Sequence, residues 1–118
     1  MSSGPSLAER IETIESGYEF MLAYAAQGRE DDSVGGPGPK IRDVLQGIEG
    51  ALDGLAQAVA TDAGPFVAVL EEDAGKARAA VGFVLAQDGI SSQLVDNLNA
   101  SIHLRALLTD LFLLDEAK

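Results

Sequence analysis

The sequence IRDVLQGIEGALDGLAQAV, residues 41–59, carries the strongest structural signal in the chain. Its large apolar residues recur at alternating intervals of four and three, which places them along one face of a helix. These residues are Ile41, Leu45, Ile48, Leu52, Leu55 and Val59. The pattern predicts an amphipathic helix over about residues 40–60 that packs against other helices through this face.

Similar apolar stripes lie on both sides of this segment. Ser6 and Glu9 form the pattern of a capping box, and Pro65 stands where a helix can begin, because its missing N–H is not needed there. Short connections after the second and third helices favour antiparallel neighbours. The sequence therefore predicts an all-α, antiparallel up-down four-helix bundle in a single domain, residues 1–118, with its other helices over about residues 6–27, 65–87 and 91–115.

Residues 28–39, GREDDSVGGPGP, form the clearest loop. The three glycines and two prolines of its second half disfavour helix and strand. The segment is longer than bundle connections usually are, and we expect a flexible loop that adds specificity to partner contacts.

Composition excludes several classes of function. Eight Lys and Arg against nineteen Asp and Glu give a net charge of −11, which disfavours binding to nucleic acid or to an anionic membrane. The chain has no cysteine, which excludes thiolate catalysis and disulfides. No signal peptide or membrane-spanning apolar run is visible, so we expect a cytoplasmic protein, and the Ala- and Gly-rich composition suggests a bacterial one.

No motif predicts a catalytic centre, a metal or a cofactor. The di-iron bundles need Glu-x-x-His pairs, whereas this chain has one histidine, His103. Acidic residues form a ridge on the first helix at Glu12, Glu15 and Glu19, a pattern that is most often a solvated flank. Enzymatic activity is therefore the less favoured expectation.

Surplus apolar residues point instead to an interface. Phe20 and Tyr24 lie away from the main stripe of the first helix, and the last helix is apolar around most of its circumference. We predict a non-catalytic protein-interaction or regulatory module that forms a homodimer and contacts a protein partner. Its interface residues would be Phe20, Tyr24, Leu108, Leu111, Phe112 and Leu113.

The alternative is a helical bundle that binds a small ligand or a metal, with an enzyme as one form of this alternative. Glycines inside a helix lower its stability by about 1 kcal/mol each, so Gly47, Gly50 and Gly54 of the second helix should have a packing or binding role. Together with Gly75 and Gly82 of the third helix, these glycines predict a close contact between the two helices or the wall of a pocket. The candidate ligand-binding residues are Glu15, Tyr18, Glu19, Gly47, Gly50, Gly54 and His103.

Overall fold

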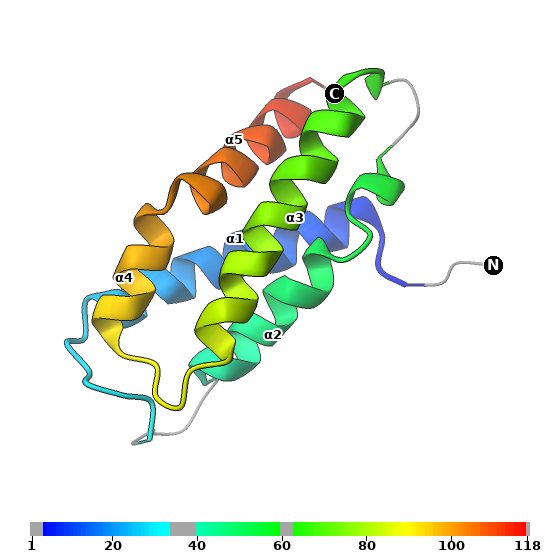
Figure 1. Ribbon diagram of the computed structural model, residues 1–118. Coiled ribbons are helices and arrows are strands. Elements are labelled where there is room, and N and C mark those ends of the chain that lie inside the picture. The colour runs from blue at the N-terminus through cyan, green and yellow to red at the C-terminus, as the bar shows by residue number, and fades with distance from the viewer. Residues whose placement is uncertain (1–3, 34–39, 60–62, 118) are drawn as a thin grey trace.

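The computed structural model describes residues 4–33, 40–59 and 63–117, and these residues form helices and loops without a strand (Figure 1). The predicted all-α class is thus confirmed for the described residues. The predicted arrangement of four helices is not confirmed, because five α-helices and one 3-10 helix are present there. The elements are α1 (Leu7–Ala25), α2 (Ile41–Leu52), η1 (Ala56–Ala58), α3 (Phe66–Leu85), α4 (Ser92–Ala100) and α5 (Ile102–Glu116).

The second predicted helix ends earlier than its periodicity indicated. Gly54 has a φ of +83°, a left-handed conformation that glycine adopts readily, and the chain turns there. The Arg10 guanidinium donates hydrogen bonds to the carbonyls of Ala51 (3.1 Å) and Asp53 (2.6 Å) at the end of α2. Leu55 remains fully buried because η1 follows and returns the chain to the core. Residue 60 and residues 34–39 of the predicted loop lie outside the described residues.

The fourth predicted helix is divided at Ser101. The backbone of Ser101 is extended, with φ −64° and ψ 143°. Its N–H donates to the Leu98 carbonyl and closes α4, while its side chain accepts a hydrogen bond from the Leu104 N–H and caps α5. One serine therefore ends one helix and begins the next, and α4 and α5 form an elbow (Figure 1).

The helices pack around one apolar core. The α1 helix packs against α2 and α4, and α3 packs against α2 and α5. Figure 1 shows the beginning of α3 and the end of α5 at the same end of the molecule, so these two helices run antiparallel. Fully buried side chains come from every α-helix and include Ile14, Met21, Leu45, Ile48, Leu70, Val81, Val95, Leu104, Leu107 and Leu111.

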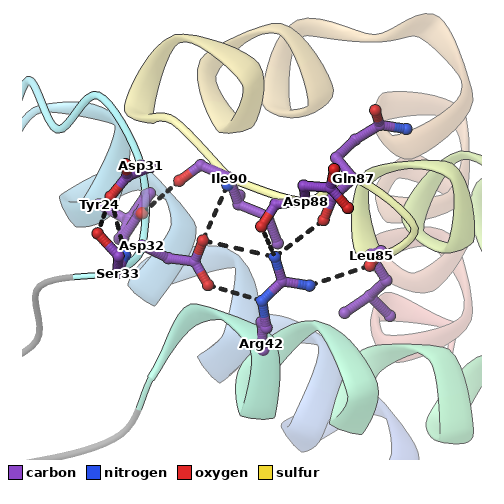
Figure 2. Close-up of polar contacts among 9 residues, drawn as sticks. All are labelled: Tyr24, Asp31, Asp32, Ser33, Arg42, Leu85, Gln87, Asp88 and Ile90. Carbon is purple, nitrogen blue, oxygen red and sulfur yellow. Dashed lines mark hydrogen bonds and ion pairs between the residues drawn. The ribbon is translucent and has the colours of Figure 1, made fainter.

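An Arg42–Asp32 clasp fixes the turn between α3 and α4 (Figure 2). Arg42 donates to Asp32 at 2.6 Å and also to the carbonyls of Leu85 (3.0 Å), Gln87 (2.9 Å) and Asp88 (3.0 Å). Asp32 in turn accepts from the backbone N–H of Ile90 at 2.9 Å. Burial opposes the ionisation of Asp32, but the bonds from Arg42 and Ile90 prevail and lower its pKa.

Tyr24 joins the same turn to α1. Its hydroxyl donates to the Ile90 carbonyl at 2.6 Å, and its own carbonyl accepts from the Ser92 hydroxyl at 2.7 Å. Tyr24 is 3% exposed, and burial, followed by the nearby Asp32, raises its pKa. The hydrogen bonds of Tyr24 therefore stabilise the core instead of serving an external contact.

None of the helices in the described part of the chain is both long enough and apolar enough to cross a bilayer.

Candidate functional site

Exposed apolar side chains gather on α3 and α5. Five of the six large hydrophobic side chains that are exposed among the described residues belong to these two helices. Ile102 is 74% exposed and Phe83 is 65% exposed, which are high values for side chains of this size. The others on α3 and α5 are Val69, Phe112 and Leu113, while Leu22 lies on α1.

Four of these side chains form two pairs, each aligned along the exposed side of its own helix. Val69 and Phe83 are fourteen residues apart on α3, and Ile102 and Leu113 are eleven apart on α5, both close to whole numbers of helical turns. Because α3 and α5 pack against each other, we call these two exposed sides together the α3–α5 face, made of Val69, Phe83, Ile102 and Leu113. Phe112 lies about 100° further around α5, on the neighbouring flank.

A shallow apolar groove marks one end of the α3–α5 face. It has a volume of about 520 Å³ and lies between the second half of α3 and the elbow at Ser101. Phe83 and Leu94 supply much of its apolar wall, and Lys76 and His103 stand among its polar lining. His103, which was a candidate ligand-binding residue, is exposed there.

A pair of carboxyl groups lies across the seam between α3 and α5. Asp110 of α5 is 6% exposed and is hydrogen-bonded to the side chain of Asp73 of α3. Its Oδ2 atom is buried without a hydrogen-bond partner. Burial, then the hydrogen bond to Asp73 and its charge, raise the pKa of Asp110 to about 7. Val69 precedes Asp73 by four residues and Leu113 follows Asp110 by three, so each stands about one helical turn from the pair. Because α3 and α5 run antiparallel, both lie on the same side of the pair.

The predicted interface residues separate into two groups. Tyr24, Leu108 and Leu111 are buried in the core, so they cannot form an exposed contact surface of this chain. The surplus apolar character of the last helix arises instead from the packing of α5 on α3 and from the elbow. Phe20 is half-buried, and Phe112 and Leu113 are exposed.

The predicted ligand-binding residues do not come together in one hollow. Gly47 lines a groove of about 580 Å³ between α1 and α2, with Glu9, Glu12 and Asp43 at its polar rim. Gly54 lines a different hollow, of about 410 Å³, between α2 and α3, and His103 lines the groove at the elbow. Within the described residues, no group of three or more His, Asp or Glu side chains is placed to hold a metal ion.

Sequence reasoning missed Asp110, Phe83 and Ile102. Asp110 stands three residues after Leu107 and one before Leu111, both fully buried, so its position on the core side of α5 was visible in the pattern. An acidic residue on an apolar face was therefore the available signal. Ile102 could not be placed without the elbow, because on an unbroken helix it belongs to the apolar stripe.

No protein-family model matches the chain, and no curated protein or solved structure matches it either.

Proposed function

We propose that the protein is a non-catalytic interaction module that associates with a second copy of itself through the α3–α5 face. The observation that carries this proposal is the concentration of exposed large apolar side chains on two adjacent helices. Leaving such side chains in water is unfavourable, by roughly 25 cal/mol for each Å² of apolar surface that an interface could bury. Contact with another apolar surface removes this penalty.

The layout of the α3–α5 face favours a second copy as its occupant. Apolar side chains stand toward both ends of the face. Phe83, near the end of α3, and Ile102, at the start of α5, lie toward one end, and Val69 and Leu113 lie toward the other, because the two helices run antiparallel. A two-fold axis through the middle would place one end of each copy on the opposite end of its partner, which is the geometry of an isologous dimer. Small side chains between the ends, including Ala79, Ala80 and Ala106, would allow close approach.

Local charge also supports this arrangement. The chain as a whole carries −11, which disfavours association through most of its surface. On the α3–α5 face, Asp110 is buried and Lys76 is bonded to Glu72 at 3.0 Å. Self-association should therefore occur where the repulsion between copies is weakest.

Replacing Ile102 with serine should weaken the dimer by at least tenfold in dissociation constant. Each symmetric interface contains Ile102 twice, and burial of one such side chain contributes about 1.5–3 kcal/mol. Sedimentation equilibrium and native mass spectrometry of the wild type and Ile102→Ser would measure the change. Because Ile102 is 74% exposed in the single chain, the substitution should leave the fold intact.

Leu22→Ser is the matched control. Leu22 is also a large exposed side chain, at 48%, but it lies on α1, away from the α3–α5 face. Its substitution should leave the dissociation constant unchanged. A wild type that stays monomeric up to about 100 μM would contradict the proposal, since a weaker contact is not a stable dimer.

The groove at the elbow supports a second candidate, binding of a small apolar ligand. Its wall is mostly apolar, with Lys76, Asn97 and His103 as polar groups that could orient a bound molecule. Native mass spectra of protein purified without chelators would show such a ligand, or a metal, as added mass. Added mass on a monomer would favour this candidate over self-association.

A further inference from the structure

We propose that Asp73 and Asp110 share one proton across the α3–α5 seam, and that loss of this proton loosens the seam as the pH rises. The pair would then act as a pH-sensitive switch beneath the α3–α5 face. The control of association by this switch rests on the proposed self-association, whereas the switch itself does not.

The two carboxyl groups come from helices that pack together, and the buried position of Asp110 favours its protonated form. Two carboxyl groups in hydrogen-bond contact need one proton as the donor, because two carboxylates would only repel. Asp110 is the buried member, 6% exposed, with Oδ2 away from water and without a partner. An ionised Asp110 would hold an unpaired charge in an apolar seam between Leu107 and Leu111, which is strongly unfavourable.

Asp73 is the residue whose hydrogen bond and charge act on Asp110. Its charged neighbours on α3 include Glu72 and Lys76, which are bonded to each other, and the charge of Asp73 also acts on Lys76. η1 carries no ionisable side chain. The other ionisable groups on the elements around the seam are Arg42, Asp43 and Glu49 on α2, Glu71 and Arg78 on α3, Asp96 on α4, and His103, Arg105, Asp115 and Glu116 on α5.

The effect of pH on stability has a defined direction. The pKa of Asp110 is raised to about 7 in the folded chain, so the folded state retains a proton that the unfolded state releases near pH 4. Stability should therefore fall as the pH rises from about 4 to about 7, and level off above that. This window lies above that of Asp32 and Glu9, whose pKa values are lowered.

Asp110→Asn tests the switch, because asparagine keeps the shape and the hydrogen bond to Asp73 but cannot lose a proton. The thermal midpoint of the wild type should fall by roughly 5–10 °C between about pH 5 and about pH 7.5, and that of Asp110→Asn by less than half as much. Asp96→Asn, an exposed acid on α4, should behave as the wild type. Equal pH dependence in all three proteins would overturn the proposal.

Titration of Asp110 followed by NMR tests the shared proton whether or not the protein forms a dimer. The carboxyl carbon of Asp110 should titrate near pH 7 in the wild type, and at lower pH in Asp73→Asn, which removes the acceptor charge. A wild-type Asp110 that titrates near the ordinary value of about 4 would overturn the shared proton.

Sedimentation at about pH 6 and about pH 8 then tests the control of association. We expect at least a threefold weaker dimer at the higher pH for the wild type, and little change for Asp110→Asn. A dimer with the same affinity at both pH values would overturn the regulatory role. A monomer at both values would overturn the proposed function, while the NMR titration would still support or overturn the shared proton.

Discussion

Replacing Gly17 with alanine is expected to lower the free energy of unfolding by about 2 kcal/mol, although alanine is the better helix former. Gly17 is buried in the middle of α1, where this helix packs against α2. A Cβ atom at this position would lie 2.6 Å from Cδ1 and 2.7 Å from Cγ1 of Ile48, and 3.4 Å from a methyl group of Val44. Ile48 is fully buried, so its side chain has little room to move aside.

Three further variants separate crowding from helix propensity. Gly75→Ala lies in the middle of α3 with open space at its Cβ position, so it should raise stability by up to about 1 kcal/mol. Ile48→Val removes the Cδ1 atom, and the Gly17→Ala/Ile48→Val double variant should therefore lose less than the sum of the two single changes. Urea unfolding of the wild type and the four variants measures these differences. A Gly17→Ala protein as stable as Gly75→Ala would contradict the close approach.

The same glycines show what periodicity could and could not predict. The sequence indicated a close helix contact or a pocket wall at five glycines of the second and third helices: Gly47, Gly50, Gly54, Gly75 and Gly82. The structure leaves open space at Gly50 and Gly75 and ordinary contacts at Gly47 (3.8 Å) and Gly54 (3.6 Å). A Cβ atom at Gly82 would lie 3.1 Å from Oε2 of Glu49 on α2, so that part of the expected approach is present. The tightest approach occurs at Gly17, at 2.6 Å. A single glycine within a helical pattern does not reveal which partner helix faces it, because that depends on the crossing of the two helices.

The predicted ends of the second and fourth helices were wrong for a related reason. The apolar intervals of residues 41–59 continue across Gly54, and those of the last helix continue across Ser101, so periodicity alone predicted unbroken helices. The breaks depend on contacts that are distant in sequence, such as the bonds from Arg10 to the end of α2. By contrast, the start of α1 depends on residues that are close in sequence, and the predicted capping box of Ser6 and Glu9 is confirmed.

The sequence predicted that the candidate site is an exposed apolar surface, but not all of the residues that form it. Apolar residues off the stripes of the first and last helices indicated surplus apolar surface, and Phe112 and Leu113 are exposed. The position of Tyr24 off the apolar stripe of its helix predicts an interface role, yet its hydroxyl donates to the Ile90 carbonyl from inside the core. A tyrosine at a helix flank satisfies either role, and only the position of α4 distinguishes them.

Replacing Arg42 with alanine should destabilise the fold by roughly 3 kcal/mol at neutral pH, the largest effect we expect from a surface-accessible residue. The variant loses the ion pair to Asp32 and three bonds to carbonyls that follow or end α3. Asp32 is only 17% exposed and would keep a charge without its partner. The stability of Arg42→Lys should lie between those of the wild type and Arg42→Ala, because lysine retains the charge but not the planar set of hydrogen-bond donors.

The pH dependence of Arg42→Ala follows from the same contacts. The lowered pKa of Asp32 means that its stabilising contribution is present above about pH 4 and is lost as the pH falls through the folded-state value. Without Arg42 that contribution shrinks, so the difference in stability between wild type and Arg42→Ala should narrow from about pH 7 to about pH 3. Urea unfolding at both pH values measures this difference in stability.

Arg78→Ala is the control for the loss of an ion pair. The ion pair between Arg78 and Asp53 is 3.7 Å long and both side chains are well exposed, so its loss should change stability little. Equal losses for Arg42→Ala and Arg78→Ala would show that the clasp does not hold the turn between α3 and α4.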